Sequence, residues 1–255
     1  MKILVAPQKV GTGMPKALAT IARIRPRVAA LTEMDLGKRS LIGQLRHALG
    51  KRYRVLAKDL GQHSQEIPIA LRVGRFCRLV SYKLLPLSPD VGVKGTGNDR
   101  WLAIVRWRLF GRAYVLLHTH VNAVIQNHDT KSPDFGEMLH NERVPVTADG
   151  MQILEDQAAK ALADPKVDGR VIVTGDLNYL PVPRAKEWEH SPQAVFRRLG
   201  MKYENSRVVY LAWGPGLRLA TAEIIAAHSA TNPADHGWIL GHLRRVWRRA
   251  NRAAA

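Results

Sequence analysis

The chain has 255 residues, 46% of them hydrophobic, and its 39 Lys and Arg against 21 Asp and Glu give a formal net charge of +18. This length suffices for a full core in one large domain or two small ones, and the sequence contains no low-complexity tract. Cys77 is the only cysteine, which excludes an intrachain disulfide, and no segment approaches the ~20 apolar residues of a membrane span. We therefore expect a cytoplasmic protein without a transmembrane segment.

In chain order, the first half alternates strand and helix patterns. Strands are predicted over residues 2–6, 27–31, 53–57, 67–73 and 76–85, and helices over 14–23 and 36–49. The segments 67–73 and 76–85 alternate well enough to predict a hairpin around Gly74.

The second half begins with the strongest hairpin pattern of the chain. Residues 101–109 alternate apolar and basic side chains, Gly111 turns the chain, and 113–117 returns. A long polar loop is predicted over 121–148. The later elements are a helix over 149–163 capped by Asp149, a strand over 171–174, a helix over 191–199, and strands over 208–212 and 217–227, the last strand candidates before residues 235–240. Hairpins mixed with crossovers indicate an α/β sandwich of two sheets flanked by helices.

The excess of basic residues predicts a polyanionic partner. A field of this sign attracts DNA, RNA or an anionic membrane surface. Nucleic acid is the first interpretation, with DNA ahead of RNA; the alternatives are a generally basic proteome and acidic protein partners. No obligate protein partner is inferred. Charge alone predicts affinity for polyanions but does not identify the ligand, so the function has to be inferred from the residues of the site.

Polar side chains flank four of the apolar runs, which is the usual position of a site on an α/β scaffold. They are Glu33 after RVAAL, His118 and His120 after AYVLL, Asp176 and Asn178 after VIVTG, and Asp235 and His236 before WIL. A carboxylate in such a place needs a metal, a cation or water, because burial without a partner is costly. Oxygen donors without a cysteine cluster favour Mg²⁺, Mn²⁺ or Ca²⁺ over zinc. A histidine accepts a proton from water near neutral pH.

Each of these groups also has a purely structural interpretation. A lone Glu33 at a strand end is typically solvated or ion-paired. The pair His118 and His120 shares one side of a strand, where both can be satisfied polar residues. Gly-Asp-Leu-Asn is compatible with an ordinary turn, and so is Asp-His. The order of the four groups and their strand context favour a functional site.

This ordered set resembles the endonuclease/exonuclease/phosphatase superfamily, which includes deoxyribonuclease I, the abasic-site endonucleases, bacterial sphingomyelinases and inositol polyphosphate 5-phosphatases. The resemblance spans residues 2–240. Its motifs are V-I-V-T-G-D-L-N at 171–178, L-H-T-H-V at 117–121, A-L-T-E at 30–33 and A-D-H-G-W-I at 234–239. It implies a four-layered α/β sandwich, with two mixed sheets packed face to face and helices outside. The catalytic domain is then expected over 1–241 and a basic C-terminal tail over 242–255.

The resemblance also implies a site for a divalent cation, Mg²⁺ or Mn²⁺. Glu33 would hold the metal, with Gln8 and Asp235 as further contacts. Asp176 would orient the nucleophilic water or assist its deprotonation, and His236 would be the general base.

The substrate contacts follow from the same resemblance. Asn178 would bind the scissile phosphate. His120 would contact the phosphate and assist the leaving group, and His118 is the alternative for that role. Asn122 and Arg100 are further candidate contacts to the substrate, although a surface arginine is the simpler interpretation of Arg100.

Two positions depart from the family pattern. The first strand of the family ends in an asparagine that contacts the metal, whereas Gln8 here is one methylene longer. The family also has an aspartate that orients the catalytic histidine, and Val209 stands at its place in R-V-V-Y at 207–210. An imidazole without an orienting partner loses much of its advantage as a base. Either another group substitutes or the activity is weakened.

Three functions remain open on the sequence alone. The first is a metal-dependent nuclease of low sequence specificity. The second is a phosphodiesterase or phosphatase for lipid headgroups or small phosphoesters. The third is a nucleic-acid-binding protein on a decayed nuclease scaffold, which Val209 and Gln8 suggest.

Overall fold

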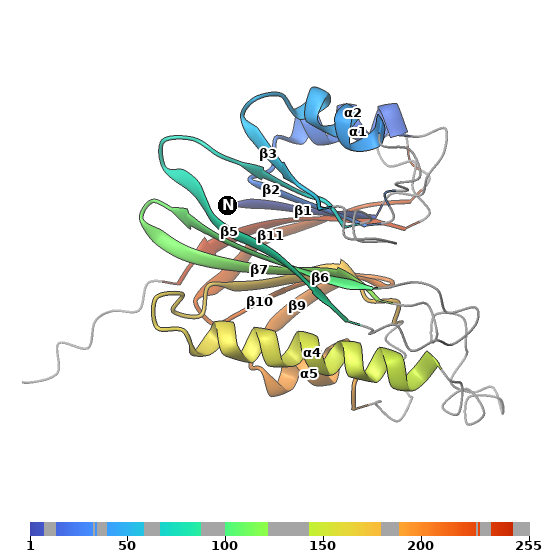
Figure 1. The fold of residues 1–255 in the computed structure, drawn as a ribbon, viewed down its shortest axis with the longest axis vertical. Helices are drawn as coiled ribbons and strands as arrows, with labels where there is room; N and C mark the ends of the chain where they lie inside the picture. The colour runs from blue at the N-terminus through green and yellow to red at the C-terminus, as the bar shows by residue number, and fades with distance from the viewer. Residues whose placement is uncertain are drawn as a thin grey trace, which may run out of the picture.

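The protein is built from four layers (Figure 1). Two six-stranded sheets face each other, helices α1 (Met14–Ile24) and α2 (Ser40–Leu49) cover one, and helices α4 (Arg143–Ala163) and α5 (Pro192–Arg198) cover the other. The computed structural model describes residues 1–7, 14–32, 34, 40–58, 67–87, 100–121, 143–179, 189–227, 229 and 236–246.

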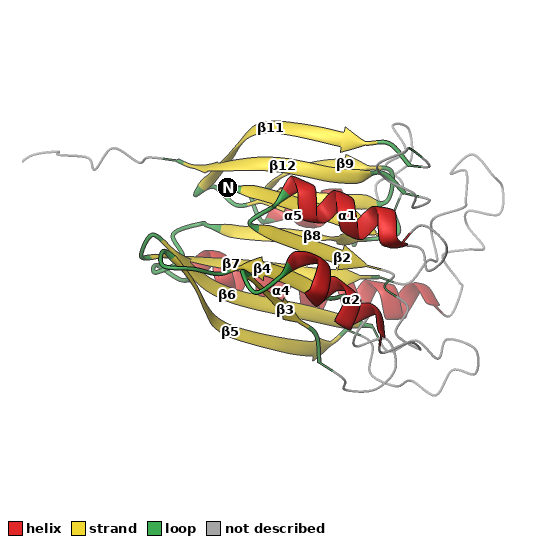
Figure 2. Cartoon of the chain, turned by 90° about the horizontal axis from the view of Figure 1, so that it is seen from above, coloured by secondary structure: helices red, strands yellow, loops and turns green. Residues whose placement is uncertain are grey.

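The first sheet joins the two ends of the described chain. In spatial order its strands are β11 (Leu217–Ile225), β12 (Trp238–Arg245), β1 (Lys2–Pro7), β2 (Val28–Thr32), β4 (Ile69–Arg72) and β3 (Tyr53–Leu56). Strand β1 pairs in parallel with β2 and antiparallel with β12. Seen from above, α1 and α2 lie over the strands (Figure 2).

The second sheet is formed by the middle of the chain. In spatial order its strands are β5 (Cys77–Pro86), β6 (Trp101–Leu109), β7 (Arg112–His120), β8 (Val171–Asp176), β10 (Val209–Trp213) and β9 (Lys202–Ser206). Strands β7 and β8 are parallel, and the other pairs are antiparallel. Each sheet thus contains one parallel pair near its centre.

Side-chain alternation produces the layers. On β10, Val209 and Trp213 face the other sheet, whereas Tyr210 faces the helices. The helices bury apolar stripes at helical spacing, as with Met151 and Leu154 of α4. Three apolar clusters result, one between the sheets and one under each helix layer.

The predicted four-layered α/β sandwich with two mixed sheets is confirmed. The predicted hairpin over 101–117 is β6 and β7, paired from Leu102↔Thr119 to Leu109↔Arg112. The predicted hairpin around Gly74 is wrong, because β4 and β5 belong to different sheets. Both edges of β4 are occupied by β2 and β3, so only the short bridge Gly74↔Cys77 forms before the chain crosses over.

Three boundaries also differ from the prediction. Helix α4 begins at Arg143 rather than at Asp149, and β9 was not predicted because its sequence KYENS carries no apolar alternation. Strand β12 continues to Arg245, so residues 242–245 of the expected tail pair with β11 and bury Leu243. None of the helices in the described parts of the chain is long and apolar enough to cross a membrane.

Candidate active site

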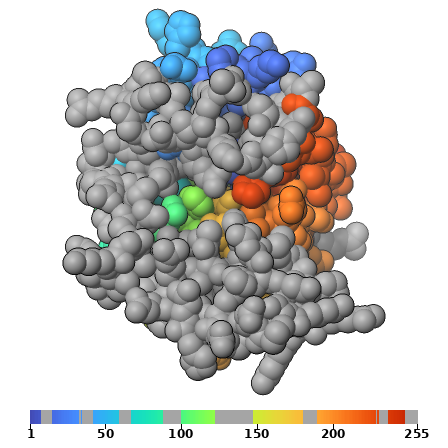
Figure 3. All heavy atoms as spheres, turned by 90° about the vertical axis from the view of Figure 1, so that its right-hand side faces the viewer, coloured from blue at the N-terminus to red at the C-terminus, as the bar shows by residue number. Residues whose placement is uncertain are grey.

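The ends of several strands meet at one edge of the sandwich. Strands β7 and β8 end there with His120 and Asp176, and β10 begins there because Val209 is the register partner of Asp176. The indole nitrogen of Trp238 donates to the carbonyl of Pro7 at 3.2 Å, which joins the start of β12 to the end of β1. Viewed onto this end, described atoms from the green, yellow and red parts of the chain lie next to one another (Figure 3).

Asp176 and His236 form the central contact of this edge. Asp176 Oδ2 lies 3.7 Å from His236 Nε2, and the carboxylate is fully buried while the imidazole is 22% exposed. The two residues come from the end of β8 and from the segment just before β12. The neighbouring Gly237 lets the chain after His236 pack closely against the end of β9, because a Cβ at position 237 would lie 2.3 Å from Ser206 Oγ. A buried carboxylate beside a partly exposed imidazole suits proton transfer to and from solvent-accessible groups.

The Gly-Asp-Leu-Asn motif forms the end of β8 and the turn that follows it, next to β7. A Cβ on Gly175 would lie 2.1 Å from the carbonyl oxygen of Thr119, so only glycine permits this strand spacing. Asn178 adopts φ 50°, which asparagine tolerates better than most residues. Its backbone N–H donates to Asp176 Oδ1 at 3.0 Å, and its side-chain amide donates to the carbonyl of Val121. The motif therefore fixes one carboxylate oxygen of Asp176 and leaves the other toward His236.

His120 stands at the same edge and contacts a cation. Arg100 Nη1 lies 3.0 Å from His120 Nδ1, and only 7% of His120 is exposed. A guanidinium can only donate, so Nδ1 is the acceptor and the proton of the neutral imidazole is on Nε2. The pair thus presents an oriented N–H group next to a positive charge.

His118 has a different environment, although it is only two residues away. Its Nε2 lies 2.8 Å from the carbonyl of Leu31 in the opposite sheet, and its Nδ1 lies 3.0 Å from Thr174 Oγ1. Complete burial lowers the pKa of His118 from 6.5 to about 4, against the raising effect of its hydrogen bonds. The imidazole is therefore neutral, with Nε2–H donating to Leu31 and Nδ1 accepting from Thr174. This geometry ties the two sheets together and favours His120 for ligand contact.

Four predicted site residues, Gln8, Glu33, Asn122 and Asp235, lie outside the described residues. Their described sequence neighbours end at this edge: Pro7 is the last residue of β1 and Thr32 of β2. Within the described ranges, no group of three or more His, Cys, Asp or Glu is placed to hold a metal ion.

The structure adds supporting residues that the motifs did not reveal. The hydroxyl of Tyr210 donates to the carbonyl of Tyr179 at 2.8 Å and accepts from Gln193 Nε2 at 2.9 Å. These bonds hold the chain just after Asn178. Thr174, which contacts His118, was also not among the predicted site residues. Its place two residues before Asp176 puts both side chains on the same side of β8, and this spacing is the signal in the sequence that could have revealed it.

No protein-family model matches the sequence, and no curated protein matches it significantly. Solved structures do match over nearly the whole chain. The mannosyl-6-phosphatase Bt3783 of Bacteroides thetaiotaomicron has a TM-score of 0.66 at 12% identity, covering 96% of this chain and 99% of its own. An endonuclease/exonuclease/phosphatase from Bacteroides vulgatus reaches 0.67 at 11% identity, with 96% and 98% covered. Truncated TDP2 from Caenorhabditis elegans reaches 0.59 at 16%, with 94% and 95% covered. The fold is that of the endonuclease/exonuclease/phosphatase superfamily, which confirms the resemblance at the level of fold.

Proposed function

We propose that the protein is a divalent-metal-dependent phosphodiester hydrolase that acts as a nuclease of low sequence specificity. The observation that carries the proposal is the contact between Asp176 and His236, 3.7 Å apart at the strand-end edge and beside the Arg100–His120 pair. A carboxylate, an imidazole and a cation-bound histidine are the groups that activate water and stabilise a phosphate.

The geometry suggests one role for each described residue. His236 accepts the proton of the attacking water, and Asp176 stabilises the imidazolium that forms and orients the water. His120 directs its Nε2–H to the phosphate or the leaving oxygen, held by the guanidinium of Arg100. Asn178 is the remaining contact to the phosphate.

The substitution at Val209 is compatible with this arrangement. Val209 is fully buried between the sheets and is the register partner of Asp176 on the adjacent strand. A carboxylate at position 209 would stand beside that of Asp176, and like charges so close disfavour each other. Asp176 Oδ2 already lies near His236 Nε2, so we propose that Asp176 supplies the carboxylate partner that the family pattern places on the neighbouring strand.

A hard divalent cation fits the donors of this edge. The described donors are the carboxylate of Asp176 and the amide of Asn178, while the only thiol, Cys77, lies in the core between the sheets. Oxygen donors select Mg²⁺ or Mn²⁺. Glu33, Asp235 and Gln8 would hold the cation, which supplies neutralisation of the developing charge on the phosphate oxygens.

Nucleic acid is the substrate that best fits the charge of the protein. The net charge of +18 counters the repulsion between a polyanion and the carboxylates of the site. The net charge does not distinguish DNA from RNA, so both are tested as substrates.

The decisive experiment is cleavage of supercoiled plasmid, single-stranded DNA and RNA by the purified protein with Mg²⁺ or Mn²⁺. We expect cleavage that EDTA abolishes and that His236→Ala and Asp176→Asn lose, with unchanged circular dichroism. No cleavage of any of the three polymers under these conditions would refute the nuclease assignment.

A second function is favoured by one similar structure, which is named a mannosyl-6-phosphatase. Its fold supports a site for small phosphoesters equally well. Release of phosphate from sugar phosphates, and hydrolysis of a chromogenic phosphodiester and of sphingomyelin, test this alternative. A kcat/KM for a sugar phosphate far above that for DNA would replace the nuclease by a phosphatase.

A further inference from the structure

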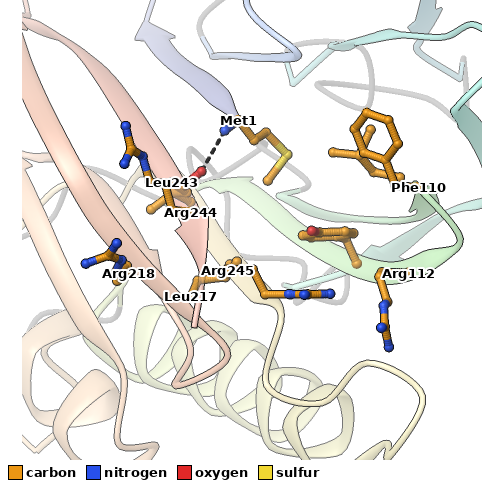
Figure 4. A pocket seen from close by; sticks show the side chains of 10 residues that line it. Met1, Phe110, Arg112, Leu217, Arg218, Leu243, Arg244 and Arg245 are labelled. Carbon is orange, nitrogen blue, oxygen red and sulfur yellow. Dashed lines mark hydrogen bonds between the residues drawn. The ribbon is translucent and has the colours of Figure 1, made fainter. Parts of the chain in front are cut away.

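A basic pocket lies at the end of the sandwich opposite the candidate active site. Strands β1 and β7 begin beside this pocket and end at the catalytic edge, so the length of the sheets separates the two. The hollow has a volume of about 590 Å³ and is lined by the starts of β7 and β11 and the end of β12 (Figure 4).

Four arginines line the hollow, and none of the described lining residues is acidic. Arg112 and Arg245 lie on the side of β12 that faces Phe110, whereas Arg218 and Arg244, which are register partners, point away on the other side of β12 (Figure 4). Arg112, Arg218 and Arg244 are exposed and form no ion pair with any residue of the chain that the structure describes. The Met1 amine donates to the carbonyl of Leu243 at 2.6 Å, shown as the dashed line in Figure 4. Cations gathered without internal partners create a positive potential that an external anion can neutralise.

The positive lining continues into an adjoining hollow of about 360 Å³. The two hollows share Leu217 and Arg218, and the second adds Lys202 and Trp213 and reaches Val246. A trough with several cations in succession suits a chain of phosphates better than a single phosphate group.

An exposed aromatic pair borders the same pocket. Phe110 lines the hollow, is 68% exposed and stacks at 5.2 Å on Phe76, which is itself 55% exposed. The guanidinium of Arg75 lies 5.3 Å from the Phe76 ring. An aromatic face beside cations is the combination by which proteins bind unpaired bases and their phosphates.

We propose that this pocket, Arg112–Arg218–Arg244 with Phe110, binds a single-stranded segment of nucleic acid while the catalytic edge holds the scissile phosphate. Phosphates of the strand contact the three arginines, and one base stacks on Phe110. The choice of nucleic acid rests on the proposed function. A bilayer surface is a weaker fit, because the arginines lie on both sides of β12, and a flexible strand can pass around the end of β12 whereas a flat headgroup layer cannot.

The test measures the affinity of the full-length protein for a short fluorescein-labelled single-stranded DNA by fluorescence anisotropy in EDTA, where no cleavage takes place. We expect Arg112→Glu/Arg218→Glu/Arg244→Glu to raise Kd about tenfold or more and to reduce the slope of log Kd against log salt by about 2, since each lost phosphate contact accounts for ~0.7. Phe110→Ala is expected to raise Kd about fivefold without changing the salt slope.

The matched control is Arg46→Glu/Arg54→Glu/Lys160→Glu, which makes the same change in net charge with exposed residues of α2, β3 and α4 that do not line either hollow. We expect its Kd to rise far less than that of the pocket variant. Equal losses in both triple variants would show a general field rather than a site and would overturn the proposal. An unchanged Kd in the pocket variant would overturn it as well.

Two further measurements separate the outcomes. Co-sedimentation with phosphatidylserine-containing vesicles identifies a membrane site if the pocket variant loses vesicle binding but keeps DNA binding, which would also overturn the proposal. Hydrolysis of a chromogenic phosphodiester reports the catalytic edge alone. The pocket variant is expected to retain this hydrolysis at the wild-type rate, so a failed nuclease assignment and a failed binding pocket give different patterns.

Discussion

The two ends of the sandwich carry opposite chemistry on the same strands. Strand β7 begins at Arg112, one of the four arginines of the pocket, and ends at His120 beside a buried carboxylate. The first end has exposed cations and aromatic rings, which suit binding. The second has the Asp176–His236 and Arg100–His120 contacts, which suit proton transfer. The two proposals therefore assign affinity for a polyanion and cleavage of its backbone to opposite ends of the fold, so we expect mutations to separate the two properties.

Substitution of the proposed catalytic pair, Asp176 and His236, is expected to have the largest effect on this comparison. We expect His236→Ala and Asp176→Asn each to lower kcat/KM for plasmid cleavage by roughly 10²- to 10⁴-fold, the usual worth of acid–base groups. Kd for single-stranded DNA in EDTA is expected to stay within about twofold of the wild-type value, because each variant changes at most one charge of the protein. His47→Ala, on the exposed side of α2, is the matched control. A parallel loss of binding and cleavage would mean that the two ends are not separable.

Substitutions of His118 test whether this buried residue between the sheets has a structural role or belongs to the proposed catalytic groups. We expect His118→Phe to lower the free energy of unfolding by about 2–5 kcal/mol, because it leaves Leu31 and Thr174 without their hydrogen-bonding partner in a buried place. Urea denaturation measures this change. His118→Gln, which keeps polar atoms at this position, is expected to lose less stability and to retain cleavage. Loss of cleavage in a folded His118→Gln protein would assign His118 to the catalytic groups.

The pH dependence of stability separates this buried imidazole from those at the edge. Its pKa is about 4 in the folded protein and near 6.5 when unfolded, so below about pH 6.5 the unfolded chain takes up a proton that the folded chain excludes. Stability is therefore full above that pH and falls as the pH drops toward 4. Between about pH 6.5 and pH 5 we expect wild type to lose about 1–2 kcal/mol more than His118→Gln, measured by urea midpoints. Parallel curves for the two proteins would contradict a buried neutral His118.

Arg100 is the cation at the catalytic end and gives the smallest expected effect. We expect Arg100→Met to lower kcat/KM for cleavage about three- to tenfold, the worth of one hydrogen bond, while Kd in EDTA changes little. The effect should not add to that of His120→Asn, because Arg100 acts through the imidazole that it contacts. Full additivity in this double-mutant cycle would indicate an independent contact of Arg100 with the substrate.

Elements with strong local patterns could be predicted from the sequence. The hairpin of β6 and β7 has alternation and a glycine turn within one short segment, so its partner is local. Strands β4 and β5 have the same local pattern, but their partners β2 and β6 lie elsewhere in the chain. The choice of partner strand therefore determined that β4 and β5 are joined by a crossover rather than a hairpin. The periodicity of a segment does not reveal which other strand it pairs with.

The candidate site shows the same limit. Asp176 and His236 are visible as polar residues at the ends of apolar runs. His118 and His120 look alike in sequence because they share one side of β7. Their contacts distinguish them: His118 bonds to the carbonyl of Leu31 in the opposite sheet, whereas His120 contacts Arg100. The arginine pocket was not foreseeable, because its cations come from three strands whose ends meet only in the folded protein.

The pairing of β1 with β12 has a consequence for biosynthesis. Val5 lies opposite Ile239, so β1 acquires its antiparallel neighbour β12 only after the chain has been synthesised beyond Trp238. Until then one side of this apolar strand offers unsatisfied amide and carbonyl groups, a template for aggregation. Contacts so distant in sequence also slow folding. Nascent chains that stop before Trp238 are thus the species of this protein most dependent on chaperones.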